Sequence, residues 1–252
     1  MQLIADPWFY AVAVPAVLLA GISKAGLGGF VMLAVPLMSL TIAPPQAAAI
    51  MLPILCLMDL LGLWAYRGQA DRELLRWLLP GALVGVAIGA LAFKVLDARW
   101  VKAVVGIECL AFALHRLVLD LRGGLPPPAP RAAGPGAFWG GVSGFTSTIA
   151  HAGGPPLMQY LMPLRLDKQR FVGTTVIFFT AVNYVKLVPY AAIGLFDRAN
   201  LGTSLALMPL VPLGYALGLA LVRRIPERPF YLLLTGSLLL VGARLCWEAV
   251  TG

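Results

Sequence analysis

The chain has 252 residues, of which 60% are hydrophobic and only 12% carry a charged side chain. Soluble domains contain about 25% charged residues, so this composition excludes an ordinary soluble domain and indicates an integral membrane protein. The net charge of +8 does not indicate nucleic-acid binding, because the basic residues lie between apolar runs, where they anchor membrane helices. The three cysteines lie inside apolar runs without metal-ligand spacing, so we expect no metal site and no other cofactor.

The first half of the chain contains five apolar segments, each of which is a candidate membrane helix. A helix crosses the hydrocarbon core with about 17–25 residues. The first two segments are short and flank a glycine-rich break, GISKAGLGG, whereas the other three are long enough to cross. The segments lie at 8–22, 28–42, 46–66, 74–95 and 100–119.

A stretch rich in Pro, Gly and Arg follows at 122–136, and this composition is typical of a linker. After it, two short apolar segments flank a second break, GFTSTIAHAGGPP, and three long segments follow. These segments lie at 137–150, 155–164, 170–193, 200–222 and 229–249. The sequence therefore predicts a first repeat at 1–121, a linker, and a second repeat at 137–252.

Individual residues also recur at matching places in the two halves. A single match of this kind could arise by chance, but several matches in the same order indicate a duplication. The matching residues are Gly28-Gly29 and Gly153-Gly154, Asp59 and Asn183, Tyr66 and Tyr190, Pro80 and Pro209, Gly85 and Gly214, and Gly89 and Gly218.

The distribution of Lys and Arg indicates how the repeats are oriented. If each short pair of segments enters and leaves by the same side, each repeat crosses the membrane three times and the repeats are inverted. Apart from Lys24 and Lys186, this places 12 basic residues on the linker side and five on the other. Because basic loops face the cytoplasm, we expect a cytoplasmic linker and external termini. A re-entrant hairpin and two short spans give the same parity, so both stay open.

The expected fold is therefore an all-α polytopic membrane protein. It has two inverted repeats, and each consists of a glycine-broken helical hairpin plus three transmembrane helices. Inverted repeats with interrupted helices are common among secondary transporters, whose substrate sites lie near the bilayer midplane at the interface of the repeats.

The two breaks have the features expected of a binding site. Non-helical backbone within a membrane must line a cavity or be buried in protein, and the N-terminus of a half-helix attracts anions. Pro155 marks a helix start, because proline is favoured in the first turn. Glycines at a break can also serve only to admit a neighbouring helix, and this alternative stays open. The expected anion-binding residues here are Lys24, Gly28, Gly29, Ser147, His151, Gly153 and Gly154.

Further polar side chains lie on one face of the predicted span at 170–193. With about 100° per residue, Thr175, Asn183 and Lys186 face the same direction. We expect them to add hydrogen-bond donors and positive charge to the site. Lys186 could instead reach water beyond the outer end of its helix.

Asp59 and Glu108 are acidic residues inside predicted spans. An ionisable residue within the membrane is a functional hypothesis by default, so either could carry a proton that is coupled to transport. Either could instead pair with a nearby base. Arg244 and Glu248 have the i,i+4 spacing of a structural pair on one helix.

Four motifs resemble the TauE/SafE family of sulfite exporters and four-toluene-sulfonate-uptake permeases, and together they cover nearly the whole chain. The motifs are the two breaks at 21–29 and 144–156, PxxxxxDxxxxxxYR from Pro53 to Arg67, and VGTTVIFFTAVNYVK at 172–186. The resemblance implies a permease of the bacterial inner membrane for sulfite, sulfonates or related anions, with export expected. It differs from the family at His151-Ala152, where a glycine-rich pair is usual.

Other classes of function stay as alternatives. An enzyme is not expected, because the sequence has no HExxH or GxSxG motif and its two histidines lie far apart. A permease for an organic carboxylate or a metal ion, and a membrane assembly subunit without transport activity, are the rivals. The expected partners are a small anion and the lipid bilayer, while proton coupling and a homodimer stay open.

Overall fold

The computed structural model describes residues 3–24, 31–121, 128–222 and 227–251. Within these ranges every element of secondary structure is a helix. In chain order they are α1 (Pro7–Ile22), α2 (Val31–Met38), α3 (Pro44–Tyr66), α4 (Arg72–Val95), α5 (Ala98–Leu121), α6 (Ala133–Ala150), α7 (Gly154–Leu161), η2 (Met162–Leu164), α8 (Lys168–Ala192), α9 (Arg198–Leu207), α10 (Leu210–Val222) and α11 (Glu227–Thr251).

The predicted segments agree with these helices within a few residues, with two corrections. The helix after the linker begins at Ala133 rather than at 137. The segment at 200–222 is not one straight helix, because α9 and α10 meet at an angle of 45°. Pro209 lies at this bend, and proline lacks the amide that would continue the helical hydrogen bonds.

Several helices suit a membrane. In the described ranges α3, α4 and α8 are long and apolar enough to cross, and the bent pair α9 and α10 is a fourth if it counts as one span. α5 and α11, for which the sequence also predicts a crossing, are not among them; α5 carries Lys102, Glu108 and Arg116 along its length. Large apolar side chains are exposed along α4 and α5, and lipid would cover such a surface. They include Leu83, Val84, Ile88, Leu91, Ile107 and Leu114.

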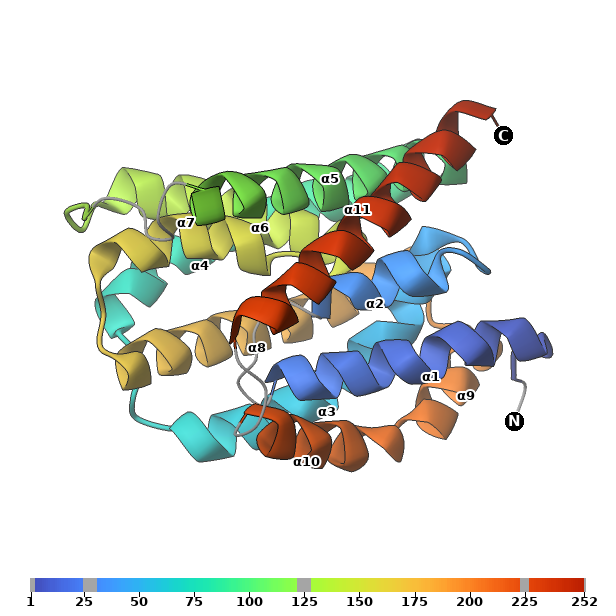
Figure 1. Cartoon of the computed structure of the whole chain (residues 1–252), viewed down its shortest axis with the longest axis horizontal. Helices are drawn as coiled ribbons and strands as arrows, with labels where there is room; N and C mark the ends of the chain where they lie inside the picture. Colours follow the sequence, from blue (N-terminus) through green and yellow to red (C-terminus); the bar gives the residue numbers. More distant parts are fainter. Residues whose placement is uncertain (1–2, 25–30, 122–127, 223–226, 252) are drawn as a thin grey trace.

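The helices run between two ends of the molecule (Figure 1). Both termini lie at one end, here called the terminal end, whereas α5 ends and α6 begins at the opposite end, here called the linker end. α1 and α2 form a hairpin that returns to the terminal end, and α6 and α7 form one that returns to the linker end. The main packed pairs are α4 with α6, α1 with α10, α5 with α11, and α3 with α8.

Glycines bring the backbones of two of these pairs into contact. A Cβ at Gly85 of α4 would lie 2.0 Å from the carbonyl oxygen of Gly141 in α6. In the other pair, a Cβ at Gly214 of α10 would lie 2.9 Å from the carbonyl oxygen of Leu18 in α1. Small residues allow membrane helices this close approach. These glycines therefore hold both hairpins against their neighbours.

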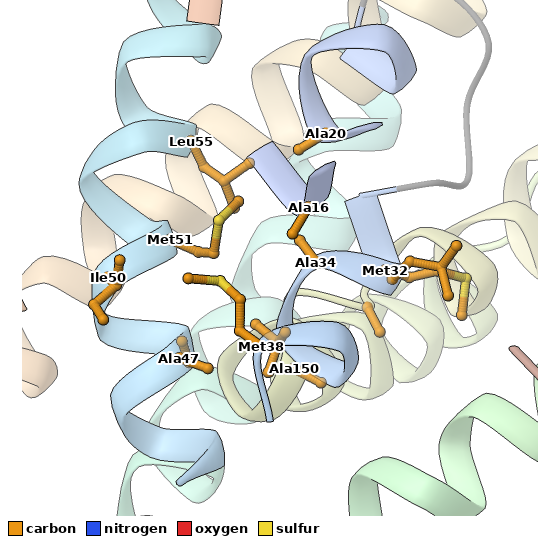
Figure 2. Packing of buried hydrophobic residues seen from close by; sticks show 14 of the residues in the cluster. Ala16, Ala20, Met32, Ala34, Met38, Ala47, Ile50, Met51, Leu55 and Ala150 are labelled. Atoms are coloured by element: carbon orange, nitrogen blue, oxygen red, sulfur yellow. The ribbon is translucent and has the colours of Figure 1, made fainter. Parts of the chain in front are cut away.

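The core beside the first hairpin is built from small and flexible side chains. Figure 2 shows Met51 and Leu55 of α3 pointing toward the hairpin of α1 and α2, where they meet Met38, Ala16 and their neighbours. Alanines let the three helices approach closely, and methionines fill the irregular gaps that remain. This packing fixes the end of α1 against the middle of α3.

Candidate functional site

The break between α6 and α7 begins at His151, which ends α6 in the left-handed conformation, with φ of 53°. Such a φ is uncommon for a residue other than glycine. The His151 amide donates to Ser147 O at 3.0 Å and closes the last turn. Ser143 Oγ donates to Gly153 O at 2.6 Å, so a side chain of α6 also fixes the segment that follows the break.

Lys186 of α8 reaches this break from the neighbouring helix. Its Nζ lies 2.9 Å from Ser147 O, 3.0 Å from Ser147 Oγ and 2.8 Å from His151 Nδ1. His151 Nε2 lies 2.9 Å from Ala48 O, which can only accept. Nε2 therefore carries the proton, and Nδ1 is free to accept from Lys186. The ring is held at both nitrogens, which fixes its orientation.

A second polar cluster joins α1, α3 and α8. Lys24, two residues after the end of α1, forms an ion pair with Asp59 of α3, and Asn183 Nδ2 of α8 donates to the other Asp59 oxygen at 2.6 Å. The Lys24 ammonium also lies 5.8 Å from the centre of the Phe179 ring, which is within the range of a cation–π contact. Asp59 is buried, with its side chain 1% exposed, whereas Lys24 is 19% exposed.

The two clusters meet at a cavity of about 230 Å³. Its polar wall combines one cationic side chain with hydroxyl, imidazole and amide groups, and the rest of its wall is mainly apolar. The lining residues are Ser23, Lys24, Val31, Met32, Leu55, Ser147, His151, Gly154, Pro155, Met158, Phe171, Val172, Thr175, Val176, Phe179 and Asn183. The cavity thus has the usual composition of a site for a small organic ligand.

The cavity extends from the middle of the molecule toward the linker end. Its lining residues on α8 run from Phe171, close to the start of that helix, to Asn183. Beyond Asn183 the packing is tight. Tyr190 is fully buried, and its hydroxyl donates to Thr148 O. The centroid of its ring lies 5.9 Å from that of Phe93 and 6.0 Å from that of Phe196.

A family model described as "Sulfite exporter TauE/SafE" matches residues 13–245 of this chain. The chain belongs to the TauE/SafE family. Searches of curated proteins and of solved structures found no match. TauE/SafE proteins are membrane transporters rather than enzymes, and the apolar helices of this chain agree with a multi-pass membrane permease. The resemblance drawn from the sequence motifs is therefore confirmed.

Most of the residues predicted for the TauE/SafE site are brought together at the cavity. Gly153 lies next to the wall, and Lys186 lies behind it. Gly28 and Gly29 fall outside the described residues. The predicted residues that line the cavity are Lys24, Ser147, His151, Gly154, Thr175 and Asn183.

Lys186 corrects one part of the prediction. It was expected to add positive charge to the site or, alternatively, to reach water beyond the outer end of its helix; its side chain is 0% exposed, which rules out the second alternative, and it is not part of the cavity wall. Its ammonium instead touches Ser147 and His151, which do line the wall. Because the Lys186 ammonium contacts the break after α6, it lies inside the protein and does not extend toward the outer end of α8.

The two acidic candidates differ. Asp59 pairs with a base, as one of its two alternatives predicted. Both carboxyl oxygens of Glu108 are buried without a hydrogen bond of normal geometry to the described residues, and Glu108 does not line the cavity. Arg244 and Glu248 form the predicted pair, with Nε and Oε1 3.0 Å apart, and Lys102 joins them.

Sequence reasoning missed the apolar wall of the cavity. Phe171 and Phe179 lie on α8 at four-residue spacing from Thr175 and Asn183, so the same helix face carries all four. The periodicity that found the polar residues of this face could have found the aromatic ones as well.

Proposed function

We propose that this TauE/SafE protein is a secondary transporter that exports small sulfur-containing anions, sulfite or organosulfonates, across the bacterial inner membrane. One observation carries the proposal. Within the described chain, Lys24 on the cavity wall and Lys186 behind it bring two cationic side chains to a cavity whose wall is mainly apolar. Buried cationic groups at membrane depth favour an anion as the ligand.

Further donors at the same end support an oxyanion. α7 begins at Gly154, where a Cβ would meet no atom within 4 Å, so a ligand can approach the backbone there closely. The N-terminal amides of a helix attract negative charge, and at the start of α7 the amide of Gly154 can serve, because Pro155 and Pro156 lack an N–H and the Leu157 amide donates to Gly153 O. Lys24 donates one ammonium hydrogen to Asp59, and because an ammonium group has three, the others can bind a ligand. The geometry therefore offers both amide and ammonium donors to one anionic head group.

The apolar part of the wall favours an organic ion over a bare inorganic one. Val176, Phe179 and Met158 would contact a hydrocarbon group while the head group lies at Lys24. Burial of such a group contributes about 25 cal/mol per Å² of apolar surface. An organosulfonate fits this division better than sulfite does. An organic carboxylate also has a charged head group and an apolar part, so it is the second candidate.

The packing supports two inverted repeats and hence alternating access. The two hairpins enter from opposite ends of the molecule (Figure 1). Asp59 and Asn183, which occupy equivalent places in the repeats, contact each other between α3 and α8 at 2.6 Å. Where α5 crosses α11, a Cβ at Gly106 would lie 3.0 Å from Gly242 O, and a Cβ at Gly242 would lie 3.0 Å from Gly106 O. Reciprocal contacts of this kind are expected along a two-fold axis.

The proposed orientation places the linker end in the cytoplasm and both termini outside. Arg67, Arg131 and Arg170 lie at the linker end. The positive-inside rule favours this side as the cytoplasmic one. The cavity then reaches toward the cytoplasm, which is the side from which an exporter loads its substrate.

The test is flux in proteoliposomes that contain the purified protein. Labelled sulfite, ethanesulfonate and propionate are supplied separately, with and without a pH gradient, and empty liposomes are the control. We expect ethanesulfonate to be transported, and Lys24→Met to abolish its flux. A matched control is Lys102→Met, which removes a lysine that pairs with Glu248 on the far helices.

Flux of propionate alone would replace the sulfonate with the carboxylate. Absence of flux for all three ions, in protein that remains folded, would contradict the transport of small anions. That result would favour a membrane subunit that acts with a partner. A pH gradient that accelerates sulfonate flux would add proton coupling to the mechanism.

A further inference from the structure

The charges around the cavity do not cancel. Lys24 and Lys186 supply two positive charges, and Asp59 supplies one negative charge. The sequence contains no acidic residue at 25–30, the part of the first break outside the described chain. Glu108 does not line the cavity, and its carboxyl oxygens form no hydrogen bond to Lys24, Asp59 or Lys186. The count that matters for a bound ion is therefore that of these three side chains.

Asp59 is ionised and fully engaged. One carboxylate oxygen accepts from the Lys24 ammonium and the other from Asn183 Nδ2, and both partners are donors at these atoms. An ionised carboxylate only accepts hydrogen bonds, so this arrangement suits the charged form. Asp59 therefore cancels the charge of Lys24 and holds it at the wall of the cavity.

Lys186 has no such partner in the part of the chain that the structure describes. Its Nζ lies within hydrogen-bond distance of three acceptor atoms, which is the number that an ammonium group can serve. All three acceptors, on Ser147 and His151, are neutral. A buried cation without a counter-ion is costly, and an anion in the adjoining cavity would supply the missing charge.

We propose that Asp59 determines the charge of the transported ion. Because it neutralises Lys24, the site keeps a single uncompensated positive charge, that of Lys186, and therefore selects monoanions against dianions. This inference rests on the proposed transport of anions and adds a selectivity that the family match does not contain. Asp59 acts through Lys24 and does not itself contact the ion.

The experiment compares two ions of similar length and different charge, ethanesulfonate with one negative charge and sulfoacetate with two. Flux in proteoliposomes and ligand-induced thermal stabilisation of the purified protein are both measured. We expect the wild-type protein to prefer ethanesulfonate. In Asp59→Asn, Lys24 is released and the site gains one positive charge, so the preference should shift toward sulfoacetate by about tenfold or more.

Two variants separate charge from structure. Lys24→Met combined with Asp59→Asn removes both members of the pair and leaves one positive charge, so in thermal stabilisation, which does not require flux, ethanesulfonate should again be preferred to sulfoacetate. Asp167→Asn removes the same charge at an exposed helix start, where asparagine also caps, and should leave the preference unchanged.

The outcomes distinguish this inference from the transport proposal. Binding of both ions with the expected ratios but without flux would contradict transport and support charge selection. Flux with the same ratio in the wild type and in Asp59→Asn would overturn the role of Asp59 and leave transport intact. A wild-type preference for sulfoacetate, or no stabilisation by either ion, would also overturn it.

Discussion

Two neighbouring glycines in the break between α6 and α7 have opposite surroundings. A Cβ at Gly153 would lie 2.6 Å from Ser143 O, 2.8 Å from Ser143 Oγ and 2.9 Å from Ser147 Cβ. A Cβ at Gly154 would meet no atom within 4 Å. The φ of Gly153 is −69°, which any residue adopts. Alanine at Gly153 is therefore opposed by crowding against α6 and not by backbone strain.

We expect Gly153→Ala to lower the free energy of unfolding by about 2–4 kcal/mol. Overpacking of a tight site costs about 1–3 kcal/mol, and the nearest atom here belongs to the backbone of Ser143, which cannot rotate away. Displacement of Ser143 also weakens its hydrogen bond to Gly153 O, which contributes about 1 kcal/mol. For a chain of this size the melting temperature should fall by about 4–16 °C. Gly154→Ala should change stability by less than about 1 kcal/mol.

The measurement is thermal unfolding of both variants in detergent, followed by tryptophan fluorescence, with flux measured separately. Gly154→Ala should melt like the wild type but bind the anion more weakly, because its methyl group enters the space beside the Gly154 amide at the start of α7. Equal melting temperatures for Gly153→Ala and Gly154→Ala would refute the packing described for the break. Unchanged flux in Gly154→Ala would show that the Gly154 amide is not part of the anion site.

Two further predictions concern the helix interfaces. Tyr190→Phe removes the hydroxyl that donates to Thr148 O, and maleimide should then label Val176→Cys faster from the terminal side, in a background without native cysteines. An unchanged labelling rate would show that the hydrogen bond between Tyr190 and Thr148 does not help to close the cavity on the terminal side. Gly85→Ala should destabilise the protein by about 3 kcal/mol or more, because its Cβ would lie 2.0 Å from a carbonyl oxygen of α6. Gly236→Ala, where a Cβ meets nothing within 4 Å, is its control and should melt like the wild type.

The helices could be predicted because the signals for them are local. The length and hydropathy of an apolar run decide whether a helix forms in lipid, and clusters of glycine and proline mark the breaks. The bend between α9 and α10 was harder to predict from the sequence. Pro80 and Pro209 occupy equivalent places in the sequence, yet α4 continues through Pro80 while the second helix bends. Neighbouring helices decide this difference, and a single proline does not reveal it.

The site could be predicted by residue type but not by partner. The polar residues near the breaks and on one face of α8 were found, because polar groups within apolar runs are rare. Which base pairs with Asp59 depends on how α1 lies against α3, and no local signal carries that information. The position of Lys186 behind the cavity wall depends in the same way on the crossing of α8 and α6.

If the two halves are repeats as proposed, a comparison of residues at matching places also explains why the cavity reaches one end only. Tyr190 and Tyr66 are equivalent, but Tyr190 is fully buried and bonded to Thr148 O, whereas Tyr66 is half-buried. One turn after Asn183 comes Lys186, and one turn after Asp59 comes Gly62, which has no side chain. The protein is sealed on the side where the larger residues of these pairs lie, and the cavity extends toward the end where the smaller ones lie. If the protein alternates its access, we infer that the layer around Tyr190 must loosen as the one around Tyr66 closes.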